Sequence, residues 1–333
     1  MSILANKIQH VVINRTDAMG DVILTLPACI YLKSLFPHLT ITFLGRNYTK
    51  AIIECCPAID HFINYDELKL LPEQEQVNTL REKNIDAIVH IFSHKPTAIL
   101  ARKAGINIRI GSSSKFYNWF NCNRLIKLSR KNSPLNEAQL NIYLLKELGV
   151  THIPSLAEIA ALYPDNFKPR AELNEELKSK LDKTKFNLII HPKSHGHGCE
   201  WDMENFTKLI WQLPAEKFNI MITGSQKEHE LFKEWIPKLP DHVTDMSGTM
   251  GMADLISFVF HCDGLLASGT GPLHLAAASG IHTLGLFPLT RSINAKRWGP
   301  VGIKAEYMES DGDDLGSISV DMVYNKINAW LAE

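Results

Sequence analysis

The sequence lacks a long hydrophobic run. No stretch approaches about 18 uninterrupted apolar residues, the length expected of a membrane-spanning helix, and no secretory signal is visible near the first residue. Six scattered cysteines form no Cys-x-x-Cys pair, which argues against a disulfide framework and against a structural zinc site. We therefore expect a cytoplasmic protein with reduced thiols.

An excess of either charge is also absent. The 333 residues include 35 Lys and Arg against 36 Asp and Glu, which gives a formal net charge of −1. Proteins that coat nucleic acids carry a strong basic excess, so this balance argues against a nucleic-acid partner. At about 150 residues per domain the length predicts two domains, each long enough to bury its own core.

Short β-rich runs alternate with helical segments, which predicts parallel sheets built from βαβ units. The expected strands cover residues 8–14, 40–44, 85–92, 187–191, 218–223, 264–268 and 282–287. Three prolines within 154–170 indicate a linker. The predicted fold is α/β, with two Rossmann-like doubly wound domains facing each other across a cleft, over 1–165 and 170–333. The last helix, about 318–332, could pack back on the first domain.

The loop after the first expected strand has the sequence RTDAMGD, from Arg15 to Asp21, and opens a helix. Gly20 supplies the backbone freedom that a tight strand-to-helix turn needs. Asp17 and Asp21 lie near the helix N-terminus, where either could act as a helix cap. Alternatively, Asp21 is a general base, because a carboxylate within hydrogen-bond reach can deprotonate an attacking hydroxyl. The residues alone leave both interpretations open.

Two glycine-containing loops in the second half suit a phosphate group. The segment SGTGPLH, residues 268–274, opens a helix and can present backbone N–H groups to an anion, with Thr270 and His274 beside them. The third glycine of the dinucleotide fingerprint is absent, and so is a Walker A motif. In the loop 191–201, Lys193 and Ser194 are suitable phosphate partners. We expect a diphosphate ligand; the alternative is a close helix–strand crossing without a ligand.

The loop 191–201 also contains a possible set of metal ligands. His195, His197 and Cys199 stand at every second position. This spacing on a loop is not a usual zinc pattern, and no fourth ligand is evident. The favoured interpretation is a nucleotide-binding loop, and we predict no metal site.

Together the three loops resemble glycosyltransferase family 9, the ADP-heptose:lipopolysaccharide heptosyltransferases. The motifs that carry the resemblance are RTDAMGD, HPKSHGHGCEWDMENF at the start of the second domain, and TGPLHLAAASG followed by HTLGLFP. They occur in the family's order over nearly the whole chain. The ordered set is more specific than any single motif.

The resemblance implies a GT-B fold, with the acceptor mainly on the first domain and the nucleotide-sugar on the second. It implies an inverting transfer of heptose from ADP-heptose to the inner core of lipopolysaccharide, with Asp21 as the catalytic base. On the acceptor side we expect Arg15, Asp17 and Gly20. The nucleotide-sugar contacts implied are Lys193, Ser194, Glu228, Thr270, Gly271 and His274. No cofactor is required, and the involvement of a divalent cation stays open.

The chain departs from the family pattern at two positions. Cys199 stands where many members have a basic residue, and Gly269 where many have Asp. The first removes an expected phosphate cation, for which Lys193 could compensate. The second removes a carboxylate that could hold a divalent ion or a sugar hydroxyl. Two alternatives therefore remain: a relative that moves a different sugar, and a catalytically silent protein that binds a sugar-nucleotide or glycan.

Acidic residues are absent from residues 87–136. The same stretch carries nine cations: Lys95, Arg102, Lys103, Arg109, Lys115, Arg124, Lys127, Arg130 and Lys131. It also contains four aromatic residues, Phe116, Tyr117, Trp119 and Phe120. One interpretation is a solvated basic face with a buried aromatic cluster. The other is a docking surface for an anionic glycolipid on the cytoplasmic face of the inner membrane, with peripheral membrane contact. Its expected acceptor contacts are Lys95, Arg102, Lys115 and Arg124.

Overall fold

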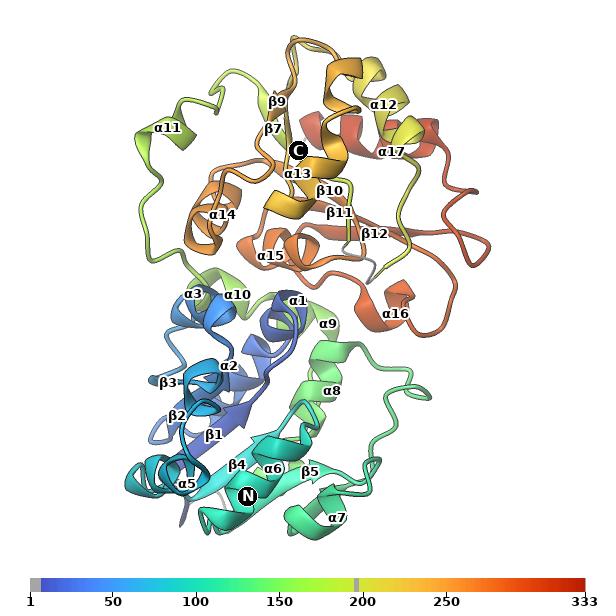
Figure 1. The fold of residues 1–333 in the computed structure, drawn as a ribbon. Helices are drawn as coiled ribbons and strands as arrows, with labels where there is room; N and C mark the ends of the chain where they lie inside the picture. The colour runs from blue at the N-terminus through green and yellow to red at the C-terminus, as the bar shows by residue number, and fades with distance from the viewer. Residues whose placement is uncertain (1–6, 195–197, 333) are drawn as a thin grey trace. The chain divides into compact units, whose positions relative to one another are not determined.

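The computed structural model describes residues 7–194 and 198–332. The chain folds as two compact units, Met1–Lys168 and Pro169–Glu333. The elements of the first unit are β1 (His10–Asn14), α1 (Met19–Ile23), α2 (Leu26–Leu35), β2 (Thr40–Gly45), α3 (Lys50–Glu54), β3 (His61–Asn64), α4 (Tyr65–Leu68), α5 (Glu73–Glu82), β4 (Ala87–His90), α6 (Lys95–Lys103), β5 (Ile108–Ser112), α7 (Asn118–Asn121), β6 (Arg124–Ile126), α8 (Glu137–Tyr143), α9 (Leu156–Ala160) and α10 (Tyr163–Asn166) (Figure 1).

The second unit is a further α/β fold with its own sheet (Figure 1). Its elements are α11 (Glu175–Lys178), β7 (Phe186–His191), α12 (Met203–Gln212), β8 (Phe218–Ile222), α13 (Gln226–Phe232), β9 (Thr244–Asp245), α14 (Met252–Val259), β10 (Gly264–Ser268), α15 (Gly271–Ser279), β11 (His282–Phe287), α16 (Ala295–Trp298), β12 (Ala305–Glu309) and α17 (Val320–Ala329).

Both sheets are doubly wound. The strand orders are β3-β2-β1-β4-β5-β6 and β12-β11-β10-β7-β8-β9, and every strand pair is parallel. The winding direction reverses between β1 and β4 in the first sheet and between β7 and β10 in the second. Ligands of such sheets bind outside the carboxyl ends of the strands at this switch point. The loops singled out from the sequence follow β1, β7 and β10, so all three lie at a switch point.

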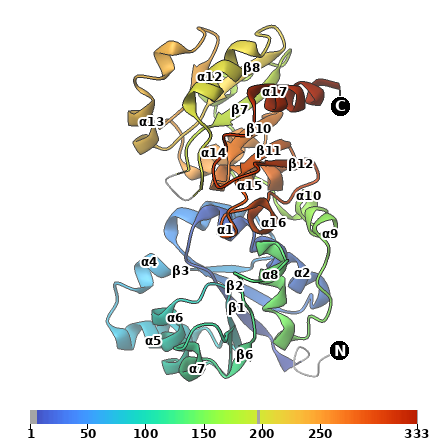
Figure 2. The same cartoon turned by 90° about the vertical axis from the view of Figure 1, so that its right-hand side faces the viewer.

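Helices cover the two faces of the first sheet (Figure 2). The pair α2 and α8 packs together on one side, and α5, α6 and α7 pack in sequence on the other. The central strands are apolar and buried between these layers, as parallel strands covered on both faces require. The ends of β1 and β4 are joined by polar side chains, because the Nδ2 of Asn14 lies 2.8 Å from Nδ1 of His90. Burial lowers the pKa of His90 to about 3, with His94 and Arg109 adding to the effect, so the ring is neutral.

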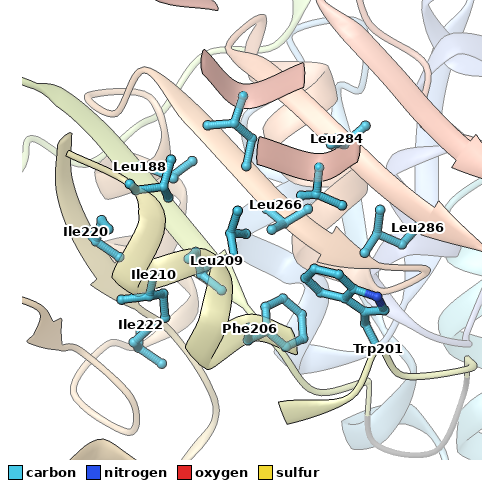
Figure 3. Close-up of a cluster of buried hydrophobic side chains, with 14 of the residues drawn as sticks. Leu188, Trp201, Phe206, Leu209, Ile210, Ile220, Ile222, Leu266, Leu284 and Leu286 are labelled. Atoms are coloured by element: carbon cyan, nitrogen blue, oxygen red, sulfur yellow. The ribbon is translucent and has the colours of Figure 1, made fainter. Parts of the chain in front are cut away.

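The second sheet is covered by α12, whose Phe206, Leu209 and Ile210 recur at helical spacing and are buried. These side chains point into a cluster with strand residues (Figure 3): Leu188, Ile220, Ile222, Leu266, Leu284 and Leu286. The last helix, α17, lies beside α12, and its Val323 and Ile327 join the same cluster. The buried residues of the last helix thus pack in the core of the second unit.

Most of the proline-containing segment predicted as a linker is folded onto the first unit, and the boundary between the units, at Lys168 and Pro169, lies near its end. A capping box between Ser155 and Glu158 begins α9, and α10 follows. Tyr163 and Phe167 are buried, and the Tyr163 hydroxyl donates to the Ile23 carbonyl at 3.0 Å. Pro164 stands in the first turn of α10, where proline is tolerated, and Pro169 is the first residue of the second unit.

The helices within residues 7–194 and 198–332 include none that is both long and apolar enough to cross a bilayer.

Candidate functional site

A buried arginine lies directly after β1. Arg15 is 2% exposed, and its backbone N–H donates to the Leu44 carbonyl at 3.0 Å. Its Nε and Nη2 donate to the two carboxylate oxygens of Asp17 at 2.8 and 3.1 Å. The same Nη2 is also paired with Oδ1 of Asp21. One guanidinium therefore holds both aspartates of the RTDAMGD loop.

The other side of this Arg15 cluster comes from α8 and the loop before it. The Nη1 of Arg15 donates to Glu137 Oε1 at 3.2 Å and to Asn141 Oδ1 at 3.0 Å. Arg130 donates to the same two side chains, at 2.9 Å to Glu137 and 3.2 Å to Asn141. Sequence reasoning missed Glu137 and Asn141, and it predicted no helix here; their i, i+4 spacing on α8 places them on one face.

Three carboxylates, of Asp17, Asp21 and Glu137, share two guanidiniums in this cluster. Burial raises the pKa of Asp21 to about 6; Arg15 opposes this rise, while Asp17 and Glu137 add to it. Burial lowers the pKa of Arg15, but the carboxylates more than offset it and keep the guanidinium charged. A carboxylate with a pKa just below neutrality is ionised at pH 7 and suited to accept a proton, as a general base must.

The structure does not support helix capping as the role of either aspartate. The residue that caps α1 is Ala18, and α1 has no side-chain cap hydrogen bond. Asp21 lies in the first turn of α1 and is paired with Arg15 instead. The expectation for Gly20 was wrong in one respect, because this glycine lies inside α1 with helical backbone and does not form the turn.

The four cations expected to bind the acceptor are spread over the surface of the first unit. Lys95 begins α6 and lines a surface cavity of about 320 Å³ beside α5. Arg102 lies in the last turn of α6, and Lys115 precedes α7; both are exposed. Arg124 on β6 lies 3.8 Å from Glu147. Among the described residues, none of the four pairs with the Arg15 cluster.

In the second unit a glutamate in the loop after β7 accepts hydrogen bonds from two other residues of that loop. Glu200 Oε2 accepts from Lys193 Nζ at 2.8 Å, and its Oε1 accepts from the Ser194 N–H at 2.9 Å and the Ser194 hydroxyl at 3.1 Å. Burial opposes ionisation, but these donors hold the pKa of Glu200 below its usual value. The two residues predicted to contact phosphate thus converge on one carboxylate. Sequence reasoning missed Glu200, because only the loop geometry brings it to Lys193.

The loops after β7 and β10 approach each other closely. The Trp201 N–H donates to the Ser268 hydroxyl at 3.2 Å. A Cβ placed on Gly198 would lie 2.7 Å from the Gly269 carbonyl oxygen, so this approach requires glycine. His195 and His197, part of the metal hypothesis, lie outside the described residues. Within the described residues, no group of three or more His, Cys, Asp and Glu side chains is placed to hold a metal ion.

The loop after β10 leads straight into α15, which begins at Gly271. Thr270 is the N-cap residue, and its side chain makes no cap hydrogen bond, so the first N–H groups of the helix carry no side-chain cap. His274 lies one turn into the helix and is buried. Burial lowers the pKa of His274 to about 4, and its Nδ1 has no hydrogen-bond partner among the described residues. This end of α15 offers an anion neutral donors and the helix dipole.

Glu228 has a structural contact at the carboxyl end of β8. It forms a capping box with Ser225 at the start of α13: the Ser225 N–H donates to Glu228 Oε2 at 2.7 Å, and the Glu228 N–H donates to the Ser225 hydroxyl at 3.3 Å. The side chain is buried. It lies at the same edge of the sheet as Lys193 and Thr270.

The sequence profile of glycosyltransferase family 9 (heptosyltransferase) matches residues 75–315. A protein of Haemophilus influenzae that carries the name glycosyltransferase is 28% identical over 301 residues, which cover 88% of this chain and 86% of that protein. The lipopolysaccharide core heptosyltransferase OpsX of the same organism is 22% identical over 284 residues, which cover 82% of this chain and 77% of OpsX.

Solved structures show the same fold over nearly the full length. The Escherichia coli ADP-heptose lipopolysaccharide heptosyltransferase II superposes with a TM-score of 0.75 at 19% identity and covers 97% of this chain and 98% of its own. The E. coli heptosyltransferase WaaC, solved with ADP, superposes with a TM-score of 0.73 at 16% identity and covers 97% and 100%. The prediction of two Rossmann-like domains of the GT-B class is confirmed.

Proposed function

Because the chain belongs to glycosyltransferase family 9, the heptosyltransferase family, we propose that it transfers heptose from ADP-heptose to the inner core of lipopolysaccharide. The observation that carries this proposal is the Arg15 cluster, which holds the Asp21 carboxyl with a pKa of about 6 at a switch point of the first unit. The second unit offers N–H groups and Lys193 at its own switch point. The first site thus supplies a carboxylate that can act as the base, and the second supplies donors that can bind a diphosphate.

In the proposed reaction, the Asp21 carboxylate takes the proton of the acceptor hydroxyl, whose oxygen attacks the anomeric carbon of the heptose. The bond from that carbon to the β-phosphate oxygen breaks, and ADP leaves on the opposite face, so the configuration inverts. Arg15 is a positioning residue, because its guanidinium is committed to Asp17, Asp21 and Glu137. A base of this kind contributes ~10²–10⁴-fold in rate.

We assign the donor diphosphate to Lys193, Ser194 and the start of α15 at Thr270, Gly271 and His274. The neutral His274 can donate one ring N–H, and the helix dipole favours the negative charge that develops on the leaving group. Lys193 donates to Glu200 in the structure, so the diphosphate competes with that carboxylate for the same ammonium. Glu228 is the candidate for the nucleoside, in addition to its part in the capping box.

The acceptor is anionic, and the proposed enzyme works at the cytoplasmic face of the inner membrane. Lys95, Arg102 and Lys115 are exposed and pair with no acid among the described residues, so they are available to phosphates and acidic sugars. Arg124 becomes available to the acceptor once its 3.8 Å contact with Glu147 is broken.

The experiment is ADP release by the purified protein from ADP-heptose, with and without heptose-deficient lipopolysaccharide. ADP release that depends on the acceptor supports the proposal. Turnover of a UDP-hexose but not of ADP-heptose would keep the family and contradict the donor. A second candidate, transfer of a different sugar, has one structural observation in its favour: Cys199 is uncharged and Glu200 neutralises Lys193. Silence with both donors, despite binding of ADP, would favour a protein that only binds the sugar-nucleotide.

A further inference from the structure

Three aromatic side chains are exposed around α7 in the first unit. Phe116 is 74% exposed, Trp119 60% and Phe120 61%. They form one patch, because the ring of Phe116 lies 5.1 Å from that of Phe120 and 6.5 Å from that of Trp119, measured between centroids. The interpretation of a buried aromatic cluster is therefore wrong for these three residues. We call them the α7 aromatic patch.

The polarity of this segment is inverted relative to an ordinary surface helix. Asn118 and Asn121, the polar residues of α7, are buried while its aromatic residues face out. The Nδ2 of Asn118 donates to the Ser112 carbonyl at 2.9 Å, and the Nδ2 of Asn121 donates to the Tyr117 carbonyl at 2.6 Å. Large exposed apolar patches on a folded domain mark surfaces that contact a partner or a membrane.

The patch is held rigidly by the sheet beneath it. A Cβ on Gly111 of β5 would lie 2.8 Å from Cys122 Sγ and 3.0 Å from Asn118 Nδ2, so glycine allows α7 to pack closely against the strand. Arg109 Nε donates to the Asn121 carbonyl at 2.7 Å, at the end of the helix. The Trp119 Nε1–H donates to the Ser113 carbonyl at 2.9 Å. The polar group of the indole therefore has a hydrogen-bond partner within the protein, and the rings can move from water into an apolar environment without losing it.

Lysines flank the patch, and the segment of the chain that carries it has no acidic residue. Residues 87–136 contain no Asp or Glu. Lys115 adjoins Phe116, and the Ser113 N–H donates to the Ile126 carbonyl, which places Lys127 at the end of the neighbouring strand. Both lysines are exposed, and neither forms an ion pair among the residues that the structure describes. Aromatic side chains with flanking lysines are the combination found at the interface of an anionic membrane.

We propose that the α7 aromatic patch inserts into the interfacial layer of an anionic phospholipid bilayer, with Lys115 and Lys127 contacting lipid phosphates. The inference rests on the proposed function only because a lipopolysaccharide acceptor would bring the enzyme to such a surface. The aromatic rings supply the apolar contact and the lysines supply attraction that salt screens. The contact is peripheral and reversible.

The test compares sedimentation of the full-length protein with sucrose-loaded vesicles of phosphatidylcholine alone and of phosphatidylcholine mixed with phosphatidylglycerol. We expect binding to the mixed vesicles, which falls at least about tenfold in the variant Phe116→Ser/Trp119→Ser/Phe120→Ser. The matched control is Trp211→Ser, since Trp211 of α12 is 63% exposed and its Nε1–H also donates to a carbonyl, that of Lys238 at 3.3 Å. The control should bind as wild type does.

A second readout does not depend on the triple variant. Brominated lipids should quench part of the tryptophan fluorescence of the wild type. That part should disappear in Trp119→Phe and persist in Trp211→Phe. The variant Lys115→Gln/Lys127→Gln should bind more weakly at low salt and show a smaller salt dependence.

Wild-type binding that is equal for the two vesicle types, or undiminished in the triple variant, would overturn the proposal. So would a triple variant that binds vesicles normally but changes the oligomeric state of the free protein, which would assign the patch to a second copy. Failure of the proposed function is separable: a lipid-free inner-core oligosaccharide would then receive no sugar even from the wild type, while vesicle binding that depends on the patch persists.

Discussion

In the first unit, the loop after β1 and helix α8 place three carboxylates around a buried arginine. In the second unit, by contrast, the loops after β7 and β10 carry backbone donors, a lysine and a neutral histidine. The strand orders of the two sheets are alike, and in both the loops extend from the switch point. The side chains on those loops therefore decide the chemistry, not the topology. In the proposed reaction, one switch point accepts a proton and the other binds an anion.

The two sites also differ in how firmly their charges are held. Arg15 and Glu137 have side chains that are 3% and 1% exposed, while those of Lys193 and Glu200 are 23% and 27% exposed. A buried pair that loses one partner leaves an uncompensated charge, but a partly exposed pair can turn to water or to a ligand. We therefore expect the first site to tolerate substitution poorly and the second to exchange its partners.

The largest expected effect is on stability in the first unit. Arg15→Met should lower the free energy of unfolding by about 3–5 kcal/mol, because three carboxylates lose their shared guanidinium. Chemical denaturation followed by circular dichroism measures this. Lys50→Met is the control, since Lys50 and Glu54 form an exposed pair worth about 0.5 kcal/mol or less. Equal losses in the two variants would remove the contrast between buried and exposed charge.

The next effect is on nucleotide affinity in the second unit. Lys193→Gln should weaken ADP binding by about 10–100-fold, the equivalent of a charge-assisted hydrogen bond of about 1.5–3 kcal/mol. Titration calorimetry with ADP measures the change. Lys208→Gln removes an exposed lysine of α12 that pairs with Glu204 and should leave ADP binding as it is. An unchanged affinity in Lys193→Gln would mean that the diphosphate lies elsewhere.

A smaller effect is a shift in pH dependence. In the wild type kcat/KM should rise with pH through about 6, as Asp21 of the free enzyme ionises. The charge of Asp17 raises the pKa of Asp21, so Asp17→Asn should move this midpoint to lower pH. Glu73→Gln, which removes an exposed acid that pairs with Lys103, is the control. A midpoint that stays in place would show that Asp17 does not act on the titrating group.

The same group predicts the sign of a stability change with pH. Asp21 has a pKa above its ordinary value of 3.8 in the folded protein, so the unfolded chain releases this proton first. Its contribution to stability is present below pH 3.8 and is lost as pH rises through about 6. Wild type and Asp21→Asn, compared by thermal unfolding at several pH values, should differ in this slope.

The smallest effect concerns the glutamate that holds Lys193. Glu200→Gln should let ADP bind more tightly, by up to about fivefold, because a partly exposed ion pair is worth about 0.2–1 kcal/mol and no longer competes with the diphosphate. The same calorimetric titration measures it. Weaker binding of ADP would contradict competition and would make Glu200 a residue that positions Lys193 for the ligand.

Patterns along the chain predicted the buried parts of both sheets well. The strands 264–268 and 282–287 have the predicted bounds because they are continuous apolar runs between turn residues. Five strands were missed: the edge strands β3, β6, β9 and β12, and β5 beside β6. They are short or partly exposed and carry no such run. RTDAMGD was predicted as a functional loop, but its arginine partner network was not, because Glu137 and Asn141 are far along the chain.

Two contacts could not be read from local pattern at all. Glu200 follows Cys199 in a loop whose backbone path decides which side chains meet. The outward position of Phe116, Trp119 and Phe120 depends on Asn118 and Asn121 taking the inner positions against β5. Propensity favours aromatic residues inside, and tertiary packing against Gly111 overrides it here.

The most direct test of a proton-accepting first unit and an anion-accepting second unit is a single variant, Asp21→Asn, measured for both turnover and ADP binding. The account predicts that kcat with ADP-heptose and heptose-deficient lipopolysaccharide falls by ~10²–10⁴-fold while the Kd for ADP stays at the wild-type value. Turnover close to that of the wild type would contradict the assignment of Asp21 as the base, and so would a loss of activity explained by lost ADP binding.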